Sequence, residues 1–92
     1  MEVVYRPSFL RRHKKLPPSR RTAVQRAIDR LLDVLTTHQT SPGGLGIKRL
    51  QDDLWEIRSD IRDRIVFLLC RATIEFLFVG NHDDIRRFLR QR

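Results

Sequence analysis

Three apolar segments in the second half of the chain follow one another so closely that they can pair in only one way. They span residues 54–59, 64–71 and 73–79, with a polar stretch at 60–63 and a turn at 71–72 between them. A parallel return between neighbouring strands needs a crossover of about a dozen or more residues, which these turns cannot provide. The segments therefore predict antiparallel strands that are apolar on both faces, with one face packed on helices and the other partly covered.

The first half of the chain is helical after a short strand at residues 2–5. A short helix opens at Pro7, because proline suits the first turn of a helix, and it ends before Pro17 and Pro18. A longer helix covers about 19–37, where apolar residues recur at helical spacing and form one stripe. The sequence thus predicts a strand and two helices before the sheet.

The remaining segments complete one domain that spans residues 1–92. A turn-rich loop at 40–44 closes the helical half, a short edge strand is expected at 46–51, and a short basic helix ends the chain. The predicted fold class is α+β. It is a two-layer domain with a mainly antiparallel four- to five-stranded sheet, two N-terminal helices on one face and a short C-terminal helix.

The charge balance of the chain points to a polyanionic partner. The formal net charge is +8 and the isoelectric point about 11.2, and nine Lys or Arg residues stand between Arg6 and Arg30 beside one acid, Asp29. No apolar run approaches the roughly 18 residues that a membrane helix needs. The single cysteine, Cys70, lies in an apolar strand, which predicts a buried structural thiol and a cytoplasmic protein.

A histidine after the last predicted strand is the first candidate for chemistry. His82 can carry a proton near neutral pH, and it stands where a rigid sheet presents loop residues. Arg58 and Arg64 lie in a strand pair that could place them beside it. A histidine facing guanidinium groups on an open sheet suggests phosphate chemistry.

Each of these residues also has an ordinary structural interpretation. Arg58 and Arg64 lie near acidic residues and could form surface ion pairs, which contribute little to stability. His82 precedes two aspartates and could belong to the N-cap region of the last helix. Trp55 shares a strand face with Ile57 and is expected in the core. Structural and functional roles therefore both remain open at these positions.

Several short segments follow one another at fixed spacings over essentially the whole chain. In order they are Lys14-Lys15-Leu16-Pro17, Lys48-Arg49-Leu50, Asp53-Leu54-Trp55-Glu56-Ile57-Arg58, Asp63-Arg64-Ile65-Val66-Phe67 and Val79-Gly80-Asn81-His82. In a small basic chain, this series resembles the RelE/ParE superfamily of bacterial toxins. The resemblance implies the toxin of a type II toxin–antitoxin pair, which a small cognate antitoxin neutralises.

The branches of this superfamily imply different activities. The RelE and YafQ branches imply a ribosome-dependent endonuclease that cuts mRNA, with the ribosome and mRNA as partners, whereas the ParE branch acts on DNA gyrase. In the nuclease, a ribose 2′-hydroxyl attacks the adjacent phosphorus, which needs a base, an acid and cations but demands no metal. No metal, other cofactor or small-molecule ligand is therefore expected.

The resemblance implies a catalytic set of Arg58, Arg64, His82 and Asp63. Arg58 matches a basic residue on the central strand of RelE-like toxins. Arg64 matches the family arginine near the start of the following strand, and we assign it to the scissile phosphate, where a guanidinium fork suits two oxygens. His82 stands where YafQ-like members also have histidine and is expected to act as general base or acid, while Asp63 could orient or polarise a neighbour.

Three departures from the superfamily leave other functions open. Glu56 stands where RelE-like members have a lysine, Phe88 replaces a C-terminal tyrosine, and Trp55 takes the place of a further histidine in YafQ-like members. Only part of either known catalytic set is present. The alternatives are a ParE-like gyrase-inhibiting toxin without nuclease chemistry and a non-catalytic basic RNA-binding module.

A basic surface is expected to dock on ribosomal RNA phosphates through salt-sensitive contacts that carry little sequence information. The residues expected to form it are Arg11, Arg12, Lys14, Lys15, Arg20, Arg21, Lys48, Arg49, Arg86 and Arg87. The antitoxin could use the same surface, add a strand to the open sheet edge, or lie in a groove as a helix.

Overall fold

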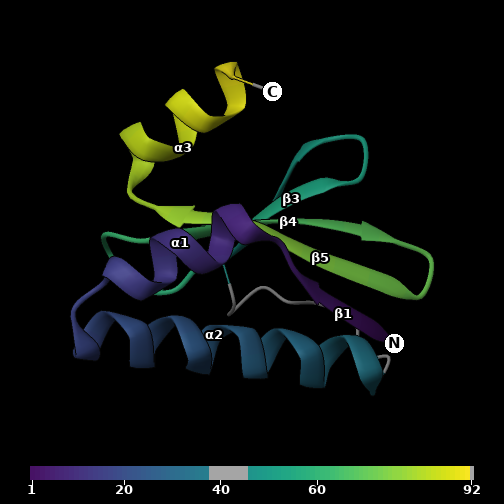
Figure 1. The fold of residues 1–92 in the computed structure, drawn as a ribbon. Coiled ribbons are helices and arrows are strands. Elements are labelled where there is room, and N and C mark those ends of the chain that lie inside the picture. Colours follow the sequence, from purple (N-terminus) through teal and green to yellow (C-terminus); the bar gives the residue numbers. More distant parts are fainter. Residues whose placement is uncertain (38–45, 92) are drawn as a thin grey trace.

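The computed structural model describes residues 1–37 and 46–91, and its elements follow the predicted order (Figure 1). They are β1 (Glu2–Tyr5), α1 (Pro7–Lys15), α2 (Pro18–Thr36), β2 (Ile47–Gln51), β3 (Leu54–Arg58), β4 (Arg64–Cys70), β5 (Thr73–Gly80) and α3 (His82–Arg90). The strand bounds agree closely with those expected from the turns and apolar runs. The predicted loop at 40–44 lies outside the described residues.

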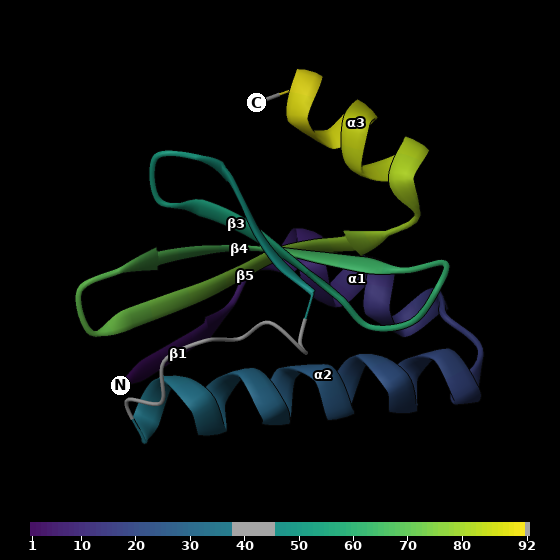
Figure 2. The same ribbon diagram turned by 180° about the vertical axis from the view of Figure 1, so that it is seen from behind.

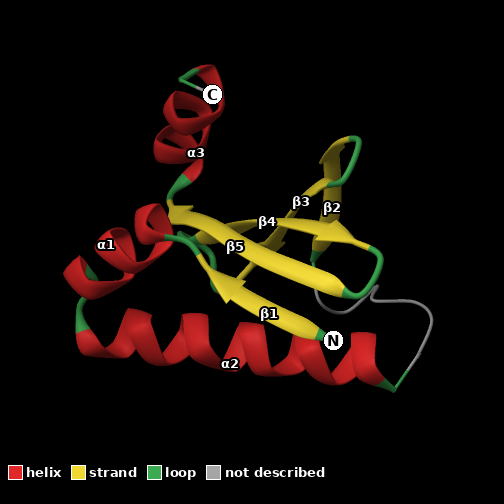
Figure 3. Cartoon of the chain, turned by 45° about the vertical axis from the view of Figure 1, so that its right-hand side comes forward, coloured by secondary structure: helices red, strands yellow, loops and turns green. Residues whose placement is uncertain are grey.

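The strands form one five-stranded sheet in the order β1-β5-β4-β3-β2 (Figure 3). The antiparallel pairing of β3, β4 and β5, predicted from their short turns, is confirmed, and β2 joins β3 as an antiparallel edge strand. The sheet is nevertheless mixed, because β1 pairs with β5 in parallel. The predicted α+β class with a mainly antiparallel sheet is confirmed.

Two core clusters lie on opposite faces of the sheet. The first joins buried side chains of α1 and α2, such as Phe9 and Ile28, to Phe67 of β4. The second joins Val66 of β4 to Ile85 of α3. Figures 1 and 2 show α2 along one side of the sheet and α3 on the other. We call the α1–α2 side the helix face and the side that α3 partly covers the open face.

A β-bulge in β5 changes which side chains reach the open face. Val66 pairs with Phe78, whereas the next residue, Phe67, pairs with Phe76, so Leu77 is an extra residue in β5. As a result, the consecutive residues Leu77 and Phe78 both pack in the second core cluster. Simple alternation along the strand does not predict this arrangement.

The thiol of Cys70 is exposed, so the prediction that it is buried is wrong. Cys70 is the last residue of β4 and pairs with Thr73 across a two-residue turn. Arg71, in that turn, has a φ of 56°. The apolar residues that precede Cys70 are covered by the core, but the strand end extends beyond it.

The start of α3 is fixed by a capping box directly after β5. The Asn81 side chain accepts a hydrogen bond from the Asp84 N–H at 2.8 Å, and the Asp84 carboxylate accepts one from the Asn81 N–H at 3.0 Å. Asp84 also binds the Arg12 guanidinium of α1 at 2.8 Å. These contacts hold the first turn of α3 against the end of β5.

Replacing Gly80 by alanine is expected to displace this turn. A Cβ at Gly80 would lie 2.7 Å from the Asp84 Cβ and 2.9 Å from its Oδ2, so α3 must move away from β5. We expect a loss of about 1–3 kcal/mol in the free energy of unfolding, as for other overpacked sites, measured by urea denaturation. Arg90→Ala, at the exposed end of α3, is the control, and a Gly80→Ala variant as stable as wild type would contradict the prediction.

Candidate functional site

A small basic pocket on the open face contains the two predicted arginines. Its volume is about 150 Å³, and it is lined by Gly46, Lys48, Glu56, Arg58 and Arg64. Cross-strand pairing builds it, because Lys48 of β2 lies opposite Glu56 of β3, and Arg58 of β3 lies opposite Arg64 of β4. Alternation along β3 directs Glu56 and Arg58 to this face, while Ile57 points into the core on the helix face.

The two arginines stand directly opposite each other on neighbouring strands. Like charges in this position destabilise a sheet, so the pair requires an anion or another counter-charge. Arg64 Nε lies 3.7 Å from Glu56 Oε2, which is a loose ion pair, and Arg58 forms no ion pair within the described residues. The expected surface pairing is therefore present for Arg64, but it leaves the pocket with an excess of positive charge.

A hydrogen-bonded loop fixes the spacing of these two arginines. Asp60 Oδ1 accepts hydrogen bonds from the N–H groups of Arg62 at 2.8 Å and Asp63 at 2.7 Å. The N–H of Ser59 donates to the carbonyl of Asp63 at 3.0 Å. Because Arg58 precedes this loop and Arg64 follows it, the closed loop holds both ends of the arginine pair.

Asp63 and Arg20 form a buried ion pair that joins the loop to α2. The Arg20 Nε and Nη2 donate to the two carboxylate oxygens of Asp63 at 2.7 and 2.6 Å, and Asp63 is completely buried. The hydrogen bonds with Asp63 raise the pKa of Arg20 above its ordinary value. The structure therefore does not bring Asp63 into the pocket with Arg58 and Arg64, and it engages Arg20, a predicted RNA-binding residue, within the protein.

His82 is the first residue of α3 and is not among the residues that line the basic pocket. Gly80, the last residue of β5, pairs with Arg64, and His82 follows two residues later. Figure 2 shows α3 leaving the end of β5. Its side chain is 62% exposed, and its Nδ1 lies 3.7 Å from Asp83 Oδ1. The N-cap itself is Asn81. His82 thus combines the predicted helix-terminal position with an accessible imidazole.

Solved structures share this arrangement of strands and helices, although no known family model and no curated protein matches the sequence. A chain of the RelB-RelE antitoxin-toxin complex from Methanococcus jannaschii matches with a TM-score of 0.71 and 18% identity, over 92% of this chain and 96% of that one. The DinJ-YafQ complex from E. coli matches with a TM-score of 0.68 and 15% identity, over 91% and 96%. A YoeB/ParE toxin from Agrobacterium tumefaciens matches with a TM-score of 0.65 and 17% identity, over 89% and 99%.

The chain has the fold of the RelE-like toxins. The fold expected from the resemblance is therefore confirmed. At these low sequence identities the similarity concerns the backbone alone. It assigns no role to any side chain of this protein.

The predicted basic surface of this RelE-like fold divides into free and engaged residues. Arg12 binds Asp84, donates to the Val79 carbonyl at 3.3 Å and lies 5.0 Å from the Phe78 ring centroid, so it ties α1 to α3 and β5. Arg87 also binds Asp84. Arg21 is half-buried. The predicted residues that are exposed are Arg11, Lys14, Lys15, Lys48, Arg49, Arg86 and Arg87. Among these, Arg49 donates to the Asp52 carbonyl at 2.8 Å and Arg87 is held by Asp84.

Two aromatic departures from the superfamily have structural roles in this RelE-like fold. Phe88 stacks on Phe78 with centroids 4.5 Å apart and an interplanar angle of 12°, within the second core cluster. Trp55 packs against the first core cluster, as expected. Neither ring lines the basic pocket.

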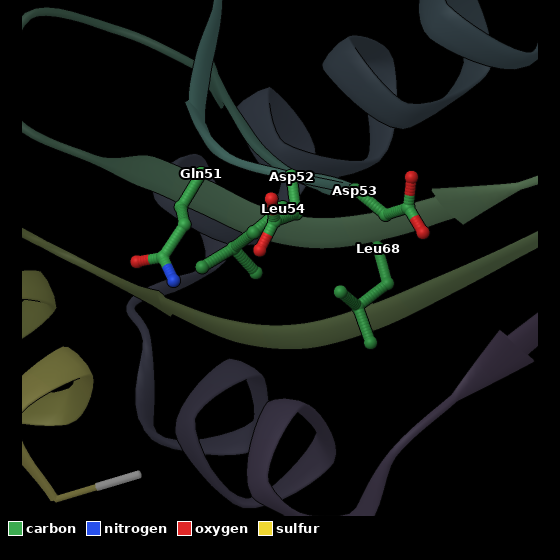
Figure 4. Close-up of a pocket in the computed structure, with 5 residues that line it drawn as sticks. All are labelled: Gln51, Asp52, Asp53, Leu54 and Leu68. Atoms are coloured by element: carbon green, nitrogen blue, oxygen red, sulfur yellow. The ribbon is translucent and has the colours of Figure 1, made fainter.

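A second hollow at the β2–β3 turn contains carboxylates but no cations. It is lined by Gln51, Asp52, Asp53, Leu54 and Leu68, and Figure 4 shows the Asp53 carboxylate pointing away from that of Asp52. The two aspartates form the turn, as expected, and not a catalytic carboxylate pair. Among residues 1–37 and 46–91, no three His, Cys, Asp or Glu side chains gather as a possible metal site.

Sequence reasoning missed the Arg20–Asp63 pair and the burial of Glu56. The pair joins residues 43 positions apart, and nothing local to either residue indicates the other. For Glu56 a signal exists, because Leu54 lies two residues away on the same strand face and is apolar and buried. No helix of the described residues is long and apolar enough to span a membrane.

Proposed function

We propose that this protein is the toxin of a type II toxin–antitoxin pair and that it cuts mRNA on the ribosome without a metal. The observation that carries the proposal is the cross-strand pair of Arg58 and Arg64 in a pocket with Lys48. Three cations around about 150 Å³ suit one phosphate group. The RelE-like fold supports the same conclusion.

The pocket suits the transition state of 2′-hydroxyl attack on phosphorus. In that step the 2′ oxygen forms a bond to phosphorus, the bond to the 5′ oxygen breaks, and negative charge increases on the phosphate oxygens. Arg64 and Arg58 stabilise this charge, and their guanidinium groups remain charged throughout. His82 is proposed to exchange a proton with the reacting oxygens, since its imidazole is exposed and begins α3 directly after the strand that pairs with Arg64.

Asp63 supports this site by position and not by proton transfer. Its carboxylate is fully buried and binds Arg20, so it is not available to RNA. The Arg20–Asp63 ion pair instead anchors the loop that separates Arg58 from Arg64. In the proposed site, Asp63 is therefore a positioning residue.

The proposed partners are a cognate antitoxin and the programmed ribosome, which places the activity in the cytoplasm. Related folds occur in complexes with RelB and DinJ antitoxins. Exposed cations on α1, including Lys14 and Lys15, provide a surface for ribosomal RNA.

Neutralising these α1 cations is expected to weaken ribosome binding. Lys14→Ser combined with Lys15→Ser should lower the slope of log affinity against log salt by about 1–2, since each phosphate contact contributes roughly one unit. Ribosome cosedimentation over a salt series measures this slope. Arg71→Ser with Arg90→Ser removes the same charge elsewhere, and an equal loss in both double variants would mean that only net charge matters.

Induction of the chain in a bacterium tests the function itself. We expect rapid loss of translation with cut mRNA, abolished by Arg64→Ala and by His82→Ala. Glu56 in the pocket and Phe88 in the core favour the second candidate, a ParE-like inhibitor of gyrase. Intact mRNA with DNA-damage signalling would support that candidate. Unimpaired growth would support the third candidate, a non-catalytic RNA-binding module.

A further inference from the structure

One guanidinium group contacts both ends of the junction between β5 and α3. Arg12 of α1 donates from Nη2 to the Asp84 carboxylate at 2.8 Å and from Nε to the Val79 carbonyl at 3.3 Å. Its Cζ lies 5.0 Å from the centroid of the Phe78 ring, a distance at which an aromatic face attracts a cation. The segment 80–83 therefore has an Arg12 contact immediately before it and another immediately after it.

Asp84 is the residue through which these contacts reach α3. Its side chain is 14% exposed, and its carboxylate accepts hydrogen bonds from Arg12, from Arg87 and from the backbone N–H of Asn81. Charge-assisted hydrogen bonds of this kind are stronger than neutral ones. The first turn of α3 is therefore held against α1, although Arg12 and Asp84 are 72 positions apart in the chain.

The absence of a side chain at Gly80 makes room for the Arg12 guanidinium. A Cβ at this position would lie 3.1 Å from the Arg12 Nη2, in addition to its close approach to Asp84. A side chain at position 80 would compete with the guanidinium for the same space. The residues of the junction thus suit the contacts that Arg12 makes there.

His82 lies inside this segment, and its own side chain does little to fix its position. The side chain is 62% exposed, and the one ion pair it forms in the described part of the chain is with Asp83, at 3.7 Å. That distance is too long for a hydrogen bond. The place of the imidazole relative to Arg64 is therefore set by the backbone of the segment that Arg12 holds.

We propose that Arg12 is a positioning residue of the candidate site, an inference that rests on the proposed nuclease function. By holding the β5–α3 junction, Arg12 fixes where the His82 imidazole meets a phosphate bound to Arg64. The sequence predicts instead that Arg12 binds RNA together with the other cations of α1. Its contacts within the protein favour the positioning role, whereas the neighbouring Arg11 is exposed.

Single-turnover cleavage of mRNA over a range of programmed-ribosome concentrations separates these two roles. Arg12→Ala should cut about 10–10²-fold more slowly at saturation, because a misplacement of about 1 Å can lower a rate by this much. Its dissociation constant for the ribosome should stay close to that of wild type. An RNA-binding residue would instead raise the dissociation constant, which is the effect expected for Arg11→Ala on the same helix.

The control is Arg26→Ala, which removes the same charge from the exposed face of α2. Arg26 forms no ion pair with another described residue, so this variant should cut like wild type. The position of His82 can also be followed without activity. The NMR signals of its ring should shift in Arg12→Ala and stay unchanged in Arg26→Ala.

Combination with His82→Ala shows whether Arg12 acts through the histidine. If it does, Arg12→Ala should cause little further loss of rate once position 82 is alanine, because residues that act as a unit are not additive. The same fold-loss in both backgrounds would mean a general structural effect and would overturn the proposal.

Two further results would count against the proposal in different ways. Cleavage by Arg12→Ala at the wild-type rate would overturn the role of Arg12 and leave the nuclease function standing. Wild-type protein that leaves mRNA intact would overturn the nuclease function and this role with it. If Arg12→Ala does not fold, Arg12→Gln decides: a lower rate at an unchanged dissociation constant supports the proposal, and a wild-type rate overturns it.

Discussion

The Arg64→Ala variant is expected to cut mRNA about 10²–10³-fold more slowly than the wild-type protein, since removing one preformed donor to a developing oxyanion typically has this effect. Arg64 lies between Arg58 and the end of β5 and is one of the three cations that line the pocket. Primer extension on mRNA from programmed ribosomes under single-turnover conditions measures the rate.

Arg64→Lys separates charge from geometry in the same assay. Lysine keeps the positive charge but loses the planar fork, so we expect recovery of only part of the lost rate. Arg71→Ala, in the exposed turn between β4 and β5, removes one arginine far from the pocket and should cut normally. An Arg64→Ala variant that retains full activity would exclude this pocket as the site of cleavage.

Arg20→Ala is expected to destabilise the protein by about 3 kcal/mol, near the lower end for breaking a buried ion pair, because the Arg20 side chain is 26% exposed. The loss arises from Asp63, which is left charged and covered without a partner. Total stabilities are typically about 5–15 kcal/mol, so this variant should unfold at a clearly lower urea concentration.

Two further variants test the cause of this loss. Arg21→Ala, at the adjacent position, has no ion pair in the described part of the chain and should be close to wild type in stability. Asp63→Asn combined with Arg20→Ala removes the unpaired charge and should recover part of the loss. If the double variant is no more stable than Arg20→Ala, the buried charge is not the source of the destabilisation.

The local elements of the fold could be predicted because each depends on neighbouring residues. The turns after Arg58 and Cys70 are too short for a crossover, which fixes the antiparallel strands. The parallel pairing of Glu2 with Thr73 could not be derived in this way, because it depends on contacts between distant segments. The exposure of Cys70 was also missed, since an apolar neighbourhood in sequence does not show where the core ends.

The candidate site was predictable to the extent that it follows from strand alternation. The expected faces of Trp55 and Arg58 on β3 are confirmed, and Arg64 lies beside Arg58 as its place in the next strand suggests. The assignment of Asp63 rested on resemblance alone, and its partner Arg20 comes from a helix on the other face. The burial of Glu56 became visible only in the structure.

The position of β1 has a consequence for biosynthesis. Glu2 to Tyr5 are made early, but they pair with Thr73 to Phe76, which leave the ribosome much later. Domains emerge at roughly 5–20 residues per second, so the N-terminal strand waits several seconds for its partner. Because Arg64 is held between β3 and β5, the basic pocket is complete only when the last strand has been added. The proposed site is therefore incomplete in any nascent chain whose β5 has not yet emerged.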